Sequence, residues 1–302
     1  MRPRLAARNP RRLGALLCGL LIGVGFAAQA GAMQAGDAAW RDRAEGAVEG
    51  RPQREPIFDS IRAYEQALAA DPSDLEARWK LLRSLHFAGE FTLRDEVEQQ
   101  ALFERARNTA EAGLDRLAER LGGSERFEQA SDAARGERLA ATGTNPEDVA
   151  RLYFWSAINW GAWSRTVGIL TAVRTGVANR VYGYASIAAE LEPGYEEGGA
   201  FRLLGSLHAG LPRIPFLTGW VDRDESIRLL AHAYDMAPSH PGNALLLADT
   251  LLEVEPERRE EAIALLAGID SLPVREDMRV EDFAIREQAR ERLAAARAET
   301  GS

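Results

Sequence analysis

The sequence predicts an all-α protein, a solenoid of stacked helical hairpins, and three observations predict it. Apolar residues recur at helix spacing along most of the chain, outside polar stretches around residues 33–55 and 122–145, and no run alternates as strand residues do. One pattern of small and apolar residues, closed by a proline, occurs three times. The composition, 46% hydrophobic and 27% charged over 302 residues, is that of a globular chain able to bury a full core.

The threefold pattern predicts a helix that ends just before a proline. Its small residues permit a neighbouring helix to approach closely, and the proline cannot continue the hydrogen-bonded ladder. The three copies are Ser60-x3-Tyr64-x2-Ala67-x4-Pro72, Val181-x3-Ala185-x2-Ala188-x4-Pro193 and Ser226-x3-Leu230-x2-Ala233-x4-Pro238.

The segment before the third copy identifies the type of hairpin. Phe201-x2-Leu204-Gly205-x2-His208 is close to the W-x2-L-G-x2-Y pattern that opens a tetratricopeptide repeat. The interval from Phe201 to Pro238 is about nine residues longer than such a repeat allows, and the excess falls at residues 211–221. The sequence therefore predicts tetratricopeptide-like hairpins, one of which carries a loop inserted between its two helices.

The remaining elements follow from the same periodicity. Two helices, 95–121 and 165–191, are longer than the repeat demands, residues 257–268 complete the last hairpin, and residues 276–299 form a charged capping helix. Gly168, Gly176 and Gly183 recur near one face of the predicted helix 165–191, at a cost of about 1 kcal/mol each relative to alanine. Tight helix packing is the favoured explanation, and a ligand-lined surface is the alternative.

The first 32 residues have the pattern of a cleaved secretory signal peptide. Five arginines precede a glycine-interrupted apolar run at residues 13–28, and small residues suited to cleavage follow it. An uncleaved anchor is the alternative. The only cysteine, Cys18, follows Leu16-Leu17 rather than a small residue, which disfavours lipoprotein anchoring. We expect residues 33–55 to form a flexible segment and residues 56–300 a single helical-repeat domain.

Charge and motif content exclude several function classes. Cleavage after Ala32 changes the formal charge from −9 to −9 − 5 = −14, and the arginines lie among acids at helical spacing, so we expect no nucleic-acid partner.

The chain lacks an H-E-x-x-H metal motif, a Walker phosphate loop and a G-x-S-x-G elbow, and its four histidines fall singly. The sequence thus predicts a non-enzyme without metal or cofactor.

The densest aromatic segment, residues 153–163, follows the helix-start signal Thr144-Asn145-Pro146-Glu147. Trp155, Asn159 and Trp163 share one face while Tyr153 and Trp160 lie on others, so the helix is apolar nearly all round and must be buried. A buried amide needs hydrogen-bond partners. Asn159 either ties neighbouring backbone together, which we favour, or supplies a polar group to an apolar ligand cavity.

The inserted segment Leu211–Trp220 is unusually apolar for a connection. Because loops run over the surface, Ile214, Phe216, Leu217 and Trp220 either fold back onto the solenoid or present a docking patch for a partner. The two outcomes carry equal weight.

At these residues the chain resembles the T component associated with tripartite ATP-independent periplasmic (TRAP) transporters. The motifs that carry the resemblance are Tyr153-Phe154-Trp155, Asn159-Trp160-Gly161, Glu192-Pro193-Gly194-Tyr195, the run from Gly198 to Gly205, Pro212, Gly219 and the closing hairpin through Pro238. The resemblance covers roughly residues 57–270. Residues that coincide with the family pattern are Trp155, Asn159, Trp160, Gly161, Arg202, Gly205, Pro212 and Gly219.

The resemblance implies a non-enzymatic periplasmic accessory protein that binds the transporter's solute-binding subunit. It also implies a homo-oligomer with an apolar pore or cavity for a hydrophobic or carboxylate ligand. Arg202 is the candidate to meet a carboxylate, on a ligand or on a nearby helix. The candidate ligand- or partner-binding residues are Trp155, Asn159, Trp160, Trp163, Arg202, Pro212, Phe216 and Trp220. A general scaffold of cell-envelope assembly without a small ligand is the alternative function.

Overall fold

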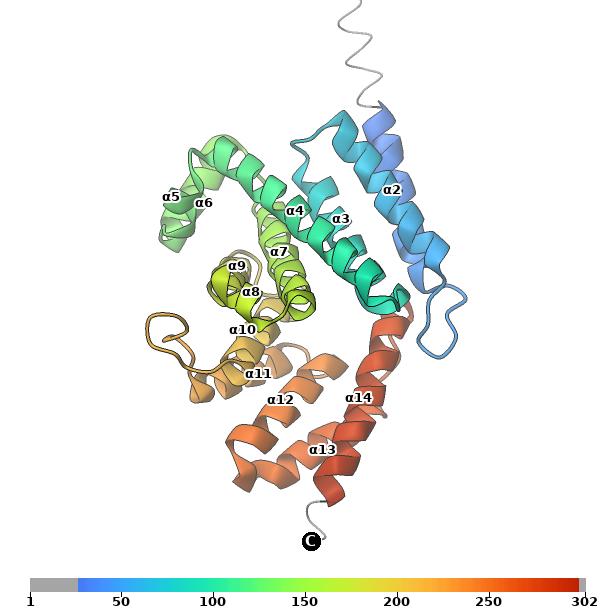
Figure 1. The fold of residues 1–302 in the computed structure, drawn as a ribbon, viewed down its shortest axis with the longest axis vertical. Coiled ribbons are helices and arrows are strands. Elements are labelled where there is room, and N and C mark those ends of the chain that lie inside the picture. The colour runs from blue at the N-terminus through green and yellow to red at the C-terminus, as the bar shows by residue number, and fades with distance from the viewer. Residues whose placement is uncertain (1–26, 299–302) are drawn as a thin grey trace, which may run out of the picture.

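The computed structural model describes residues 27–298 and confirms the predicted fold class. Those residues form helices joined by short connections, and the only strand-like pairing among them is an isolated bridge between Val48 and Arg51. Consecutive helices pair as antiparallel hairpins that stack in chain order (Figure 1). Most of the predicted signal peptide, including Cys18, lies outside the described residues.

A helix over residues 27–41 opens the described chain. The elements that follow are η1 (Asp42–Ala44), α2 (Arg54–Ala70), α3 (Leu75–Phe87), the π-helical turn η2 (Ala88–Thr92), α4 (Glu96–Leu121), α5 (Ser124–Glu128), α6 (Asp132–Thr142), α7 (Pro146–Val167), α8 (Ile169–Arg174), α9 (Val177–Leu191), α10 (Gly199–Gly210), α11 (Arg223–Met236), α12 (Pro241–Val254), η3 (Pro256–Arg258), α13 (Arg259–Ile269), η4 (Glu276–Met278) and α14 (Arg279–Ala298).

Helix ends fall where the local sequence places them. Helices α2, α9 and α11 each end within two residues of the proline that closes the repeated pattern. The side chain of Asn145 accepts a hydrogen bond from the backbone N–H of Glu147 (3.1 Å), and Pro146 is the first residue of α7. The inserted loop is also confirmed, because α10 ends at Gly210 and α11 begins at Arg223.

The prediction of one continuous helix over residues 165–191 is wrong. The structure divides it into the end of α7, the short α8 and α9, with breaks at Gly168 (φ 80°) and Gly176 (φ 66°). Both glycines adopt positive φ, which residues with a side chain rarely do. A methyl group added at Gly183 would meet no atom within 4 Å, so these glycines line no tight helix contact.

Two stretches expected to be irregular contain defined elements. Residues 122–145 include α5 and α6. Within residues 33–55, expected to be flexible, the structure has a helix through residue 41, then η1 and the first turn of α2. Trp40 packs edge-to-face on Phe87 with ring centroids 5.8 Å apart, and Arg43 is 2% exposed. The stretch is largely polar in sequence, but Trp40 and Arg43 hold it against distant helices.

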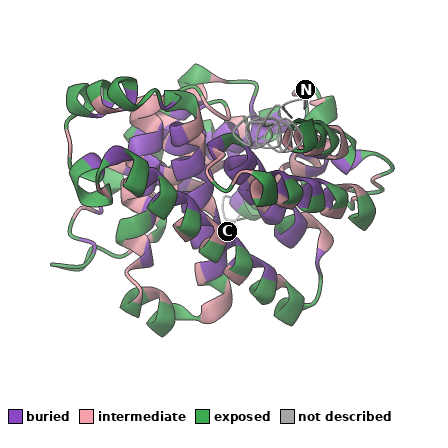
Figure 2. Ribbon diagram, turned by 90° about the horizontal axis from the view of Figure 1, so that it is seen from above, coloured by how far each residue is buried: buried purple, intermediate pink, exposed green. Residues whose placement is uncertain are grey.

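The core is organised around α7, which packs against α3, α4 and α9. Trp155, Trp160 and Trp163 are all at most 9% exposed, which confirms that this helix is buried nearly all round. Two further clusters of buried residues lie between η1, α2, α3 and α4, and between α11, α12, α13 and α14, and exposed residues form the periphery (Figure 2).

The chain curves so that the first turn of its last described helix, α14, lies against η1. The Arg43 guanidinium lies 3.0 Å from the Glu281 carboxylate, and the Arg279 guanidinium donates to the carbonyl of Ala44. Figure 1 shows that α14 begins beside the segment that precedes α2 and runs away from it toward the C-terminal end. We call this set of contacts the closing contact, because it joins residues more than 230 positions apart.

Candidate functional site

A cavity of about 300 Å³ lies where the two ends of the solenoid meet. One wall comes from Trp40, α3, η2 and α7, and the other from α10, α12 and α14. Aromatic and aliphatic side chains make up most of the walls, among which stand the side chains of Arg83, Arg202, Arg275 and Glu196. A concave apolar site with a few polar groups is the usual composition of a small-molecule pocket, and this volume is at the low end of the range.

The cavity contains two of the sequence-predicted site residues, Trp155 and Arg202. Trp155 Nε1 donates a hydrogen bond to the hydroxyl of Tyr195 (2.8 Å), and its ring lies 5.8 Å from that of His86. The tryptophan is therefore fixed in orientation at the cavity wall.

Arg202 binds the chain's own turn between α9 and α10. Its guanidinium donates to the carbonyls of Glu196 (2.8 Å) and Glu197 (2.9 Å), and to Oδ1 of Asn243 (2.8 Å). Glu196 and Glu197 have φ of 49° and 55°, a conformation costly for residues with a side chain. Burial lowers the pKa of Arg202 to about 10. Within the described chain Arg202 meets backbone carbonyls and an amide rather than a carboxylate of a nearby helix, and these contacts stabilise the turn; its role toward a ligand carboxylate stays a prediction.

Two histidines of the cavity wall are held neutral. Burial lowers the pKa of His86 to about 4. Burial, together with the positive charges of Arg202 and Arg275, lowers the pKa of His240 to about 2. His240 Nδ1 accepts the backbone N–H of Gly242 (3.1 Å) and caps α12, which requires that nitrogen to be unprotonated.

These pKa shifts predict an acid-sensitive stability. Below the unfolded-state pKa of about 6.5 the unfolded chain takes up protons that the folded chain does not, so stability falls as pH drops from 6.5 toward 4. Each histidine contributes up to about 1.4 kcal/mol per pH unit in that window. We expect His86→Gln and His240→Asn, which keeps a capping side chain, each to reduce this slope in urea unfolding from pH 7 to 4.5. His232→Gln, at an exposed site on α11, is the control, and an equal slope in all four proteins would contradict the assignment.

Asn159 lies in the core rather than in the cavity. It is fully buried, and its Nδ2 donates to the carbonyls of Leu82 (3.1 Å) and Trp155 (2.8 Å). These bonds link α7 to the backbone of α3. Asn159 therefore ties neighbouring backbone together, which is the role that the sequence favoured. Its Oδ1 is buried without a hydrogen-bond partner among the described residues.

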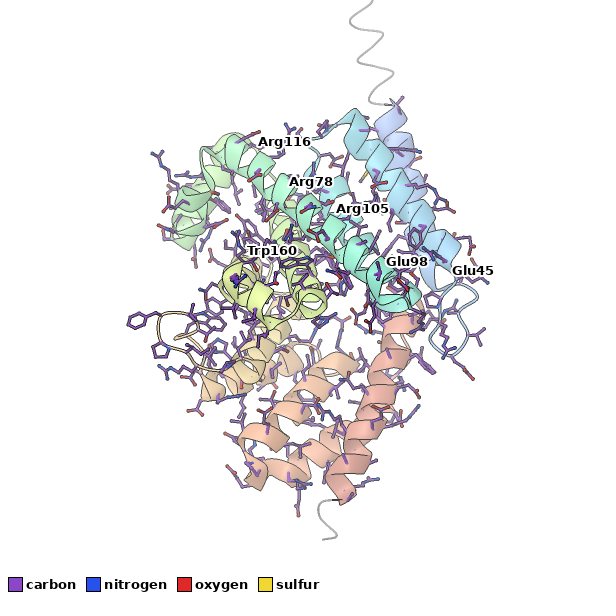
Figure 3. All side chains as sticks on the ribbon, in the orientation of Figure 1. Glu45, Arg78, Glu98, Arg105, Arg116 and Trp160 are labelled. Atoms are coloured by element: carbon purple, nitrogen blue, oxygen red, sulfur yellow. The ribbon has the colours of Figure 1, made fainter. Side chains whose placement is uncertain are left out.

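Trp160 and Trp163 also lie away from the cavity. Their rings pack edge-to-face with centroids 5.5 Å apart, and Figure 3 shows Trp160 among the helices around α7. The Arg107 guanidinium lies 4.4 Å from the ring of Trp163, and that of Arg180 lies 5.0 Å from Trp160. The cation–π contacts fix these rings within the core.

In the inserted loop Trp220 folds back onto the solenoid, whereas Ile214, Phe216 and Leu217 are exposed, and the docking patch stays a prediction. Trp220 folds back: its ring stacks on Tyr182 with centroids 4.2 Å apart, and its Nε1 donates to Asn179 (2.8 Å). The Thr218 hydroxyl bonds to the Pro212 carbonyl and accepts the N–H of Ile214, which closes the loop. Phe216 at the tip is fully exposed.

Sequence reasoning missed several residues of these sites. Arg83 and His86 lie one turn apart on the cavity side of α3, a spacing that the sequence shows but does not distinguish from a solvated face. Trp40 falls in the segment expected to be flexible. Ile169, Leu170 and Val173 on α8 are exposed by 53–80%. Because they are apolar, the sequence pattern predicted one continuous buried helix where the structure has a break.

Within residues 27–298, no group of three or more His, Cys, Asp or Glu side chains is placed to bind a metal ion, and none of the helices combines the length and hydropathy needed to span a bilayer.

No protein-family model and no curated protein matches the sequence. In structure the chain is similar to TTC0263, a thermophilic TPR protein of Thermus thermophilus, with 18% identity over 80% of this chain and 90% of that one and a TM-score of 0.43. It is also similar to yeast Tom70, with 15% identity over 79% of this chain and 60% of that one and a TM-score of 0.25. The resemblance to TRAP T components rests on the motifs of this sequence and stays a prediction.

Proposed function

We propose that the protein is a periplasmic accessory scaffold of a TRAP-type solute transporter, and that it binds the solute-binding subunit. One observation supports a protein-binding role above all others. Apolar side chains are exposed on two segments that adjoin the first turns of α9, namely α8 and the inserted loop. The docking surface, as we define it, consists of Ile169, Leu170 and Val173 on α8 and Ile214, Phe216 and Leu217 on the loop.

The loop part of the docking surface is held in place by contacts within the chain. Trp220 anchors one end of the loop on α9 through its stacking on Tyr182, and Thr218 closes the turn that carries Phe216. A loop already ordered in its bound form loses less conformational entropy on association, so more of the contact energy appears as affinity. An exposed aromatic ring is the kind of side chain that dominates interface energetics.

The identity of the partner comes from the resemblance to TRAP T components. The motifs around Asn159, Gly198–Gly205 and Pro212 support it, and the exported location follows from the pattern of residues 1–32. The cavity is the place for a hydrophobic or carboxylate ligand, since its walls are largely aromatic and aliphatic.

Native mass spectrometry of the purified protein mixed with TRAP solute-binding subunits tests the proposal. We expect a complex, and we expect Phe216→Ser and Leu170→Ser each to weaken it at least tenfold, because each removes an exposed apolar contact. Val97→Ser is the matched control: Val97 is 75% exposed on α4, outside the docking surface, so its replacement should leave the affinity unchanged.

Two outcomes would contradict this function. A complex that forms equally well with both docking-surface variants would show that these residues are not the contact. Absence of any complex, with binding instead to outer-membrane or cell-wall machinery, would favour the general scaffold of cell-envelope assembly.

A further inference from the structure

We propose that the cavity binds an amphipathic carboxylate, with the head group at Arg83 and the apolar body between Trp40, Trp155 and Phe91. This inference deepens the ligand part of the proposed function and does not depend on the docking surface, which lies on other elements.

Arg83 is a cationic group of the cavity wall that forms no ion pair with the described residues. No carboxylate lies within 4.0 Å of its guanidinium in the described part of the chain, and its Nε is buried without a hydrogen-bond partner. Burial dominates over the nearby Tyr195, Tyr64 and Glu196 and holds the pKa of Arg83 below its ordinary value. A partly buried guanidinium without a close counter-ion is costly, and a ligand carboxylate would lower that cost.

The other cations around the cavity already have partners. Arg275 donates to both carboxylate oxygens of Asp282, and Arg43, next to the cavity, pairs with Glu281. Arg202 is occupied by two carbonyls and by Asn243. A ligand anion therefore gains most by binding at Arg83.

The geometry around Arg83 holds the guanidinium in place. Its central carbon lies 3.9 Å from the ring centroid of Trp40 and 5.1 Å from that of Trp79. Stacking on tryptophan restrains the planar group and lowers the entropy lost when its N–H donors bind a carboxylate. One turn further along α3, the His86 ring also lines the cavity and adds a neutral aromatic surface beside Arg83.

The composition of the walls defines the rest of the ligand. Trp40, Trp155, Phe87 and Phe91 provide aromatic surface, and Leu245 with Ile285 provides aliphatic surface opposite. Glu196 and Glu281 also line the cavity and disfavour a ligand with more than one negative charge. A small monocarboxylate with an aliphatic or aromatic body satisfies both the single unpaired guanidinium and the apolar walls.

Isothermal titration calorimetry with octanoate and its neutral amide, octanamide, tests the proposal on the whole purified protein. We expect octanoate to bind at least tenfold more tightly than octanamide, and acetate, which lacks the apolar body, to bind at least tenfold more weakly than octanoate. Arg83→Met, which keeps the apolar stem and removes the charge, should weaken octanoate binding at least tenfold and leave octanamide binding unchanged. Arg228→Met, at an exposed arginine of α11, should change neither.

Several results would overturn the inference: no octanoate binding to the unaltered protein, equal affinity for octanoate and octanamide, or unchanged octanoate binding by Arg83→Met. If Arg83→Met fails to fold, Arg83→Lys retains a positive charge without the planar fork, and it should still prefer octanoate to octanamide. The two proposals fail separately. If the unaltered protein forms the partner complex but does not bind octanoate, this inference is wrong. If it binds octanoate but forms no partner complex, the docking function is wrong.

Discussion

Replacing Arg43 with alanine is expected to lower the free energy of unfolding by about 3–5 kcal/mol, because it leaves the largely buried Glu281 carboxylate without its counter-ion. Arg43 is 2% exposed and pairs with Glu281 at 3.0 Å. Its guanidinium also donates to the carbonyls of Trp40 and Asp277 and lies 4.0 Å from the Trp40 ring. Loss of this side chain therefore weakens the closing contact and, with it, the Trp40 wall of the cavity.

The effect of Arg43→Ala should depend on pH. Burial raises the pKa of Glu281 even with Arg43 present, and loss of the cation raises it further. The folded variant then holds a proton that the unfolded chain releases near pH 4.5, so the loss of stability grows as pH rises from 4.5 to 7. Urea unfolding at several pH values measures this difference.

Arg62→Ala is the matched control, because Arg62 is 62% exposed and pairs only with the exposed Asp59. Its replacement should change stability by less than about 1 kcal/mol. The double variant Arg43→Met/Glu281→Leu removes both charges and should recover much of the loss. A loss for Arg43→Ala as small as that of the control would mean that the closing contact contributes little to the fold.

The sequence predicted those elements whose signals are local. The proline-closed pattern located the ends of α2, α9 and α11, and Asn145-Pro146 located the start of α7, since caps and prolines act through neighbouring backbone groups. It failed at residues 165–191, where apolar spacing continues through α8. There Ile169 and Leu170 face outward, so hydrophobicity no longer reports burial.

The candidate site was predictable only in part, for a similar reason. Trp155 and Arg202 belong to motifs and do line the cavity. Arg83 and Trp40 become neighbours through tertiary packing, and the opposite wall comes from α10, α12 and α14, of which α14 contacts η1. A contact such as Arg43 with Glu281, 238 residues apart, leaves no periodic trace in the sequence.

The second large effect is expected at Asn243, where alanine should cost about 3–5 kcal/mol. The side chain is fully buried, and its Nδ2 donates to the carbonyls of Ala233 (2.7 Å), Ala237 (3.0 Å) and Glu197 (3.2 Å). Its Oδ1 accepts from Arg202. One amide thus joins the end of α11 to the turn between α9 and α10, and its removal leaves carbonyls and a buried guanidinium short of partners.

Thermal and urea unfolding of Asn243→Ala, Asn243→Asp and Asn108→Ala tests this link between α11 and the turn. The comparison distinguishes loss of the link from loss of any asparagine side chain. Asn108 is exposed on α4, so its replacement should change stability by no more than about 0.5 kcal/mol. Asn243→Asp keeps an acceptor for Arg202 but loses the N–H donors, and its cost should fall between the two. In a double-mutant cycle with Arg202→Met, the two losses should not add, because both residues support the same positive-φ turn at Glu196 and Glu197. Additive losses would show instead that Arg202 and Asn243 stabilise separate parts of the cavity wall.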